Sequence, residues 1–162
     1  MKKILNISLL IFAITLVAVG CRKEEKDASL VNIWVVENIE LKEITFANQI
    51  NVVQQAMYKA MLEAILKEEI TPYFTGWAFD FREDNRVFLT DSDGNSYGFD
   101  NYAVNGKNLS VAGNLITGTY VISKNRMHWD FDPINFLFDG DQEMFEDMGI
   151  TSVVFRFTFR KK

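Results

Sequence analysis

The sequence has few of the residues from which catalytic and metal sites are built. Its 162 residues include one cysteine, Cys21, and one histidine, His128. A single cysteine leaves no internal disulfide, and a metal site with several histidine ligands cannot be assembled. A Ser-His-Asp triad would have to use His128, and the sequence nominates no nucleophile for it. We therefore expect no catalytic residues, no metal site and no cofactor, in a protein that is not an enzyme.

The chain also has no long apolar run and no excess of basic residues. Its clearest apolar run, Leu9–Val19, has 11 residues and is interrupted by Thr15, whereas a membrane-spanning helix needs about 20. Acidic residues outnumber basic ones by 22 to 17. This balance disfavours nucleic acid as a partner, because phosphate binding needs clustered Lys and Arg. With 48% apolar and 24% charged residues, the composition is typical of one globular domain.

Residues 1–20 have the layout of a secretory signal peptide. Lys2 and Lys3 precede the apolar run, and small residues close it. The segment Ala18-Val19-Gly20-Cys21 resembles a bacterial lipobox, which implies cleavage before Cys21 and attachment of lipid to that cysteine. The alternative is a retained transmembrane anchor. Removal of residues 1–20 leaves 15 basic and 22 acidic residues, a net charge of −7.

Residues 21–29 are predicted to form a lipidated cysteine and a charged tether. Six charged residues follow one another in Arg22–Asp27, and such a run has nothing to bury. Lys23-Glu24-Glu25 resembles the export signal of Bacteroidetes lipoproteins. The resemblance implies an outer-membrane protein exposed at the cell surface; the alternative is an outer-membrane lipoprotein that faces the periplasm.

The domain predicted over 30–162 begins with a strand and a helix. The strand covers 31–41, with Ile33, Val35, Ile39 and Leu41 on one face and Trp34 and Val36 on the other. Over 48–69 the apolar period changes to three and four residues, as in an amphipathic helix. Its predicted apolar stripe is Ile50, Val53, Met57, Met61, Ala64 and Ile65. We expect Thr45 or Asn48 to cap this helix and Pro72 to stop it.

From Gly76 onward the apolar period is two, and turn residues recur at short intervals. The predicted turns are 83–85, 92–95 and 105–106, and the last suits a two-residue hairpin. Seven short strands follow the first one. Eight hairpin-linked strands predict a mainly β fold, an antiparallel meander closed into a lipocalin-like barrel, with one helix inserted after the first strand. A two-sheet sandwich is the alternative.

The sequence resembles the lipocalin-like lipoproteins of Bacteroidetes. The features that carry the resemblance are the lipobox, Trp34 on the early strand, the helical insertion, Phe79-x-Phe81 before Val87-Phe88, and Gly118-Thr119-Tyr120. The resemblance implies a barrel, and most members of the family have no assigned activity. True lipocalins also place an arginine from late in the chain across the tryptophan of the first strand, here Trp34. Arg156 and Arg160 are the candidates, although strand alternation points both at solvent.

Aromatic residues dominate the predicted inner face of the barrel. If Phe79 and Phe81 point inward, so do Trp77, Tyr97, Phe99, Tyr120, Met127, Trp129, Phe131, Phe155, Phe157 and Phe159. A barrel of eight strands is either filled by side chains or holds one small ligand. A filled core is the general expectation, and a narrow aromatic pocket under a helix lid is the alternative. The predicted ligand-binding residues are Met57, Met61, Trp77, Phe79, Tyr97, Tyr120 and Trp129.

Three further features are weaker candidates. Asp91–Asn95 superficially resembles a calcium loop, but Ser96 and Tyr102 occupy the positions that need glycine and glutamate, so a hairpin turn is expected. The acidic stretch 130–147 offers oxygen ligands for a cation; the alternative is a solvated connection with a short helix. His128 shares a strand face with Asp130 and Asp132, and we expect that face to be on the solvent side.

Three functions remain compatible with the sequence. The favoured one is a non-catalytic lipoprotein, held at the membrane by lipid on Cys21, whose barrel binds a small apolar or amphipathic molecule. The second is a structural or accessory lipoprotein that binds another envelope protein through its outer face. The third is a hydrolase, which would need a cleft with converging acids.

Overall fold

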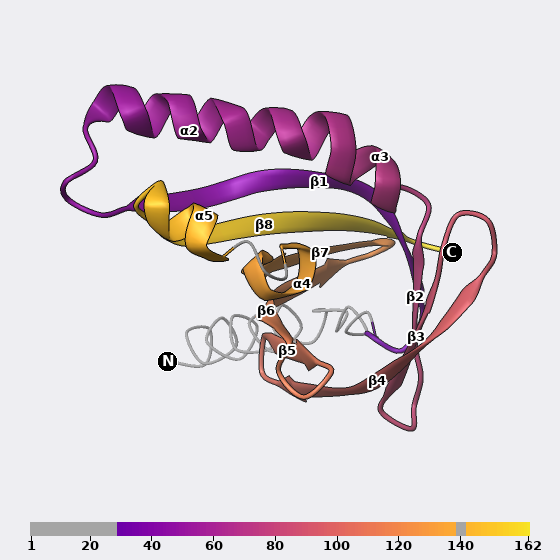
Figure 1. The fold of residues 1–162 in the computed structure, drawn as a ribbon. Helices are drawn as coiled ribbons and strands as arrows, with labels where there is room; N and C mark the ends of the chain where they lie inside the picture. Colours follow the sequence, from indigo (N-terminus) through magenta and orange to yellow (C-terminus); the bar gives the residue numbers. More distant parts are fainter. Residues whose placement is uncertain (1–28, 139–141) are drawn as a thin grey trace, which may run out of the picture.

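The computed structural model describes residues 29–138 and 142–162 (Figure 1). The predicted signal peptide, Cys21 and most of the predicted tether lie outside the described residues. Asp139 and Asp141, which belong to the acidic stretch, also lie outside them. The assignment of residues 1–20 and 21–29 therefore stays a prediction.

Eight antiparallel strands form one closed barrel in which each strand pairs with its neighbours in sequence order. The strands are β1 (Ile33–Phe46), β2 (Ala78–Phe81), β3 (Arg86–Thr90), β4 (Ser96–Asn105), β5 (Asn108–Val111), β6 (Ile116–Ser123), β7 (Arg126–Phe131) and β8 (Ile150–Lys161). Pairing of β1 with β8, from Trp34 opposite Lys161 to Phe46 opposite Ile150, closes the barrel. The predicted fold class is confirmed, and the sandwich alternative is wrong.

The helical insertion between β1 and β2 runs alongside β1, on the side of β1 away from β8 (Figure 1). It consists of α2 (Val52–Ile65), a π-helical turn η1 (Leu66–Ile70) and α3 (Thr71–Phe74). Two short helices, α4 (Ile134–Leu137) and α5 (Gln142–Asp147), connect β7 to β8.

Both predicted limits of the inserted helix are wrong. The N-cap is Asn51, whose side chain accepts bonds from the backbone N–H groups of Val53 and Gln54, in a capping box with Gln54. Pro72 does not stop the helix. In η1 the N–H of Thr71 bonds to the carbonyl of Leu66, five residues back, and this wider turn relieves the clash between a proline ring and the preceding turn.

The predicted buried stripe of the helix is also wrong. Leu62 and Leu66 are buried and Tyr58 packs against the core, whereas Val53, Met57 and Met61 are exposed. Both sides of the helix carry apolar residues at helical spacing. The spacing therefore predicts a helix but does not indicate which side packs against the barrel.

A β-bulge in β1 corrects the predicted faces of the first strand. The pairing of β1 with β8 shifts by one residue between Val36 and Asn38. Trp34 and Val36, before the bulge, are therefore buried on the same face of the strand as Ile39, after the bulge. Ile33 is partly exposed. Strict alternation fails here because the extra residue moves the apolar set to the other face.

The barrel interior follows the predicted alternation on most strands. Trp77, Phe79, Phe81, Met127, Trp129, Phe131, Phe155, Phe157 and Phe159 are all buried in one core cluster. Tyr120 is partly buried against that cluster, and the side chain of Phe99 is not among those described. Several of these side chains, including Met127, Trp129 and Phe159, have no accessible surface. The filled-core expectation therefore holds around them.

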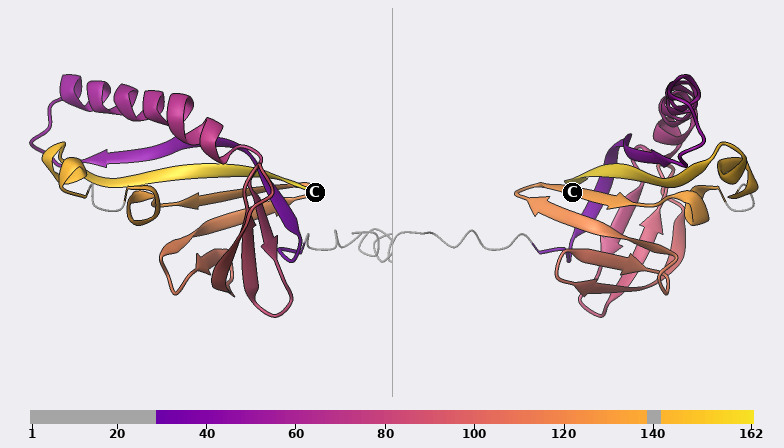
Figure 2. Two further views of the ribbon diagram at one scale, coloured as in Figure 1. Left: turned by 45° about the vertical axis from the view of Figure 1, so that its right-hand side comes forward. Right: turned by 90° about the vertical axis from the view of Figure 1, so that its left-hand side faces the viewer.

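The two ends of the barrel differ. At the terminal end, defined by residues 29–32, 82–85, 124–125 and Lys162, both ends of the described barrel domain meet: the N–H of Lys162 bonds to the carbonyl of Ile33 at 3.0 Å (Figure 2). The helical end is defined by α3, the hairpin 91–95, α4 and α5. Phe74 of α3 and Phe136 of α4 meet there, with ring centroids 6.1 Å apart.

Candidate functional site

An exposed group of aromatic rings lies at the helical end of the barrel. The ring of Tyr97 stacks on that of Trp77, with centroids 5.9 Å apart and planes within 5° of parallel. Tyr73 lies against Trp77 at 5.3 Å. Tyr97 is 48% exposed and Tyr73 is 62% exposed, whereas Trp77 is buried. We call these three residues the aromatic rim.

Local structure explains why Tyr97 lies at the surface although it was predicted to point inward. Tyr97 pairs with buried Leu89 of β3, so it occupies the inner face. However, β4 begins only one residue earlier, at Ser96. Its ring therefore leans over the end of the barrel onto Trp77 instead of entering the core.

The hairpin 91–95 fixes the phenol end of Tyr97. The hydroxyl of Tyr97 donates to the Asp91 carboxylate at 3.1 Å, and the side chain of Asn95 donates to the same oxygen at 2.9 Å. The backbone N–H groups of Asp93 and Asn95 donate to the other oxygen. These bonds, that of the Asn95 side chain first, lower the pKa of Asp91. The hydrogen bond to the Asp91 carboxylate raises the pKa of Tyr97. The hairpin interpretation of this segment is confirmed.

Ring contacts connect the rim with the centre of the barrel. The ring centroids of Trp77 and Phe74 lie 4.9 Å apart, and those of Phe74 and Phe157 lie 6.1 Å apart. Phe131 lies 4.9 Å from Phe157 and 4.6 Å from Trp129. The rim is thus the surface end of a continuous aromatic core.

Trp129 carries an unpartnered donor at the centre of that core. Its Nε1 is buried and has no hydrogen-bond partner among the described residues. A buried donor without a partner costs about 1–3 kcal/mol. Trp34, equally buried, differs in that its Nε1 donates to the carbonyl of Leu30 at 2.8 Å.

The structure separates the predicted ligand-binding residues into three groups. Trp77 and Tyr97 lie together in the rim, and Phe79 and Trp129 lie in the filled interior, 6.5 Å apart. Tyr120, which pairs with Trp129 across strands β6 and β7 and is partly buried against the core, belongs to the interior group. Met57 and Met61 are exposed on α2. Whether these residues contact a ligand stays a prediction.

Sequence reasoning missed Tyr73. It directly follows Pro72, where the sequence pattern predicts the end of the helix. The signal that points to it is its spacing of four residues from Trp77, which places two aromatic side chains at the same end of β2.

The outer face of the barrel carries an ion-pair cluster centred on Asp130. Arg156 donates two hydrogen bonds to Asp130, Nε–Oδ1 at 2.7 Å and Nη2–Oδ2 at 2.9 Å, and Lys42 pairs with the same carboxylate. Burial raises the pKa of Asp130, but the bonds from Arg156 and Lys42 outweigh burial and lower it overall. Arg160 lies 3.8 Å from Glu37. Both arginines therefore face outward, and neither packs across Trp34.

His128 and Asp132 have structural partners. His128 Nδ1 lies 3.1 Å from the hydroxyl of Thr158, its neighbour across β7 and β8. Asp132 accepts a bond from the backbone N–H of Ile134 at the start of α4. In the part of the chain that the structure describes, no three His, Cys, Asp or Glu residues gather closely enough to hold a metal ion.

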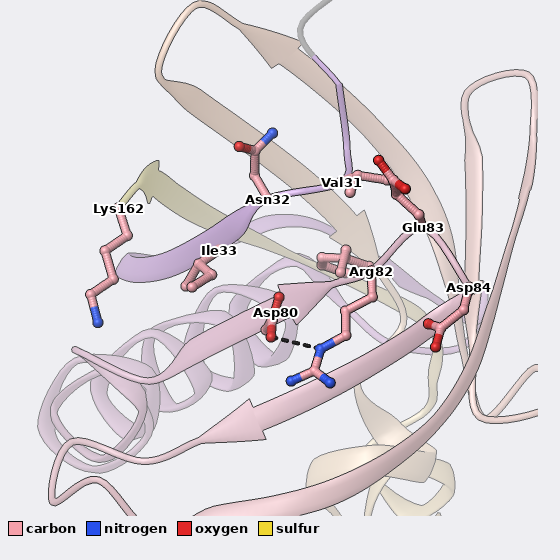
Figure 3. Close-up of a pocket in the computed structure, with 9 residues that line it drawn as sticks. Val31, Asn32, Ile33, Asp80, Arg82, Glu83, Asp84 and Lys162 are labelled. Carbon is pink, nitrogen blue, oxygen red and sulfur yellow. Dashed lines mark hydrogen bonds and ion pairs between the residues drawn. The ribbon is translucent and has the colours of Figure 1, made fainter.

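The surface formed by the described residues includes two depressions. The larger, about 640 Å³, lies at the terminal end (Figure 3) and is lined by Val31, Asn32, Ile33, Asp80, Phe81, Arg82, Glu83, Asp84 and Lys162. Arg82 pairs with Asp80 at 2.9 Å, and Glu83, Asp84 and Lys162 add further charges to the lining. The smaller, about 400 Å³, lies between β1 and the inserted helix, where Thr71 donates to the carbonyl of Ile39.

Comparison of the chain with protein families, curated proteins and solved structures finds no match. Within residues 29–138 and 142–162, no helix combines the length and hydropathy needed to cross a bilayer.

Proposed function

We propose that this protein is a non-catalytic, lipocalin-like binding protein that holds a small apolar or amphipathic molecule on the aromatic rim. The observation that carries the proposal is the parallel stack of Tyr97 on Trp77, in which a large ring stays half exposed although the core beside it is full. Aromatic surface contributes strongly to binding when it leaves water.

The rim, not the barrel axis, is the proposed site because interior rings such as Trp129 have no accessible surface. Charge at the rim restricts the polar part of the ligand. Asp91 beside Tyr97 is an ionised carboxylate with a lowered pKa, and Asp93 lies in the same hairpin. An anionic head group would be repelled, so we expect a neutral or cationic one on a flat apolar body.

Titration with Nile red, a flat neutral apolar dye, tests the proposal. We expect saturable binding that Tyr97→Ser and Tyr73→Ser each weaken by about 5- to 30-fold, which corresponds to the roughly 1–2 kcal/mol of a lost aromatic contact. Isothermal titration calorimetry gives the same constants without relying on dye fluorescence.

Val121→Ser is the matched control, because Val121 is an exposed apolar residue of β6 outside the rim. Equal dye affinity in all three variants would contradict the proposal. Native mass spectrometry of the protein purified gently from its own envelope then identifies the natural ligand as a co-purifying small mass.

We further infer that the chain is an outer-membrane lipoprotein of the lipocalin-like type found in Bacteroidetes, with lipid on Cys21 as its membrane partner. The lipobox resemblance and the charged run Arg22–Asp27 support this inference. Cys21→Ser tests it by cell fractionation: the variant should leave the membrane fraction, and retention there would show that the anchor lies elsewhere.

A second candidate function is favoured by one observation. The inserted helix exposes apolar residues, among them Val53 and Met57, which suits an accessory lipoprotein that binds a protein through its outer face. Co-purification of a second protein, lost on substitution of these residues, would support this function over ligand binding.

A further inference from the structure

The side of α2 that points away from the barrel is apolar along its whole length. Val52 and Val53 are 79% and 78% exposed, and Met57 and Met61 are 57% and 38% exposed. We call this surface the outer face of α2; it consists of Val52, Val53, Ala56, Met57, Ala60, Met61 and Ala64, all of which are exposed. Exposed apolar surfaces of this kind mark interaction sites in soluble proteins.

The opposite side of the same helix is fixed to the barrel. Leu62 and Leu66 are buried there and Tyr58 packs beside them, stacked on Phe46 at 6.4 Å. A helix that is apolar on both sides is normally covered on both sides. The barrel covers one side of α2, and the outer face is held rigidly in place for a second contact.

The charges beside the outer face are self-complementary. Lys59 and Glu63 follow each other along one flank and pair at 3.9 Å within the helix. If a second α2 packs antiparallel on the first, with the two-fold axis near Ala60 and Met61, this flank of one helix runs beside the same flank of the other. Lys59 of each copy then comes within reach of Glu63 of the other copy, because the order of the charges is reversed.

A bilayer surface fits the outer face less well. Helices that lie in a membrane interface are rich in Lys and Arg on their polar side. The polar residues of 59–69 are two lysines and three glutamates, Lys59, Lys67, Glu63, Glu68 and Glu69, so they have no excess of basic charge. We therefore propose that the outer face of α2 is the contact surface between two copies of this chain, packed antiparallel about a two-fold axis.

The size of the surface sets the expected strength. One helix face of this length offers about 500 Å² per copy, so a dimer would bury about 1,000 Å² in total, near the lower limit of specific interfaces. A Kd in the micromolar range is expected, so the dimer would form readily only where the chain is locally concentrated.

Sedimentation velocity over about 1–200 µM, with the chain carrying Cys21→Ser, tests the proposal. We expect a monomer–dimer equilibrium that Ala60→Glu abolishes, because two like charges would meet at the axis. Val121→Glu, an equal change at an exposed apolar site on β6, should leave the dimer intact. Circular dichroism checks that both variants stay folded.

Two further variants test the antiparallel geometry. Lys59→Glu and Glu63→Lys should each weaken the dimer several-fold, and the double variant should restore it. In the Cys21→Ser background, Ala60→Cys should form a disulfide-linked dimer under mild oxidation, and Val121→Cys should not. A monomer at all concentrations, or a dimer that survives Ala60→Glu, would overturn the proposal, as would a failure of Ala60→Cys to cross-link. None of these three results bears on dye binding at the rim.

Discussion

The indole Nε1 of Trp34 donates a 2.8 Å hydrogen bond to the carbonyl oxygen of Leu30. The bond folds the segment before β1 under the terminal end of the barrel, where Leu30 is buried. It also satisfies the one polar atom of a side chain that has no accessible surface. Trp129 has the same burial without such a bond, and the pair therefore forms an internal comparison.

Trp34→Phe should destabilise the protein more than Trp129→Phe. Both changes shrink a buried ring, which costs about 1–3 kcal/mol. Trp34→Phe also leaves the carbonyl of Leu30 without its donor, whereas Trp129→Phe removes a donor that had no acceptor. We expect a difference of about 1–3 kcal/mol in the free energy of unfolding, measured by urea titration. Equal losses would show that the Trp34 bond contributes nothing net.

Gly118→Ala should be among the more damaging single changes in the barrel. A Cβ at Gly118 would lie 2.0 Å from the carbonyl oxygen of Asp130 and 2.6 Å from the Cβ of Phe131. Strands β6 and β7 would have to separate locally, at a cost of about 2–4 kcal/mol in thermal or urea unfolding. Gly98→Ala is the control, because a Cβ there meets nothing within 4 Å; it should be neutral or slightly stabilising.

Asn51→Ala should cost about 1 kcal/mol, because it removes the two hydrogen bonds that the Asn51 side chain accepts from the backbone N–H groups of Val53 and Gln54. Asn48→Ala, at one of the two positions that the sequence pattern suggested for the cap, should cost almost nothing. Urea unfolding followed by circular dichroism at 222 nm compares the two variants. A larger loss for Asn48→Ala would place the start of α2 earlier in the chain.

The Asp130 cluster should make stability depend on pH in the acid range. The pKa of Asp130 is lowered in the folded state, so the unfolded chain, with an ordinary pKa near 3.9, binds the proton more readily. The stabilisation is therefore complete above about pH 4 and is lost as the pH falls through the folded-state pKa.

Asp130→Asn should cost about 1–3 kcal/mol at pH 7, the usual value of charged hydrogen bonds, and progressively less below about pH 4. Asp84→Asn, at a carboxylate that pairs with Arg86 on the exposed surface, should have a smaller effect at every pH. A loss for Asp130→Asn that does not change with pH would mean that the carboxylate charge is not the stabilising element.

The barrel could be predicted from the sequence because the pattern that indicates a strand is local and recurs along the chain. Alternation of apolar residues with turn residues between them defines β2 to β8 strand by strand. It was insufficient where the period is broken or ambiguous. The bulge after Val36 leaves no mark in composition, and the inserted helix has two apolar sides, of which only contact with the barrel selects that of Leu62.

The candidate site was predicted in part for the same reason. Alternation placed Trp77 and Tyr97 on the inner face, and both lie there. It could not indicate that Tyr97 is the second residue of its strand and therefore lies at the rim. Met57 and Met61 were predicted to form a lid because the apolar stripe was assigned to the wrong side of the helix. In the structure they belong to the outer face of α2.

Closure of the barrel by its first and last strands has a consequence for folding. β1 pairs with β2 over three residues but with β8 along almost its whole length. The partner that completes the ring is thus more than one hundred positions away, and forming that contact carries a large loop-closure entropy. The greater part of β1 therefore stays without its strand partner until β8 is available to pair with it.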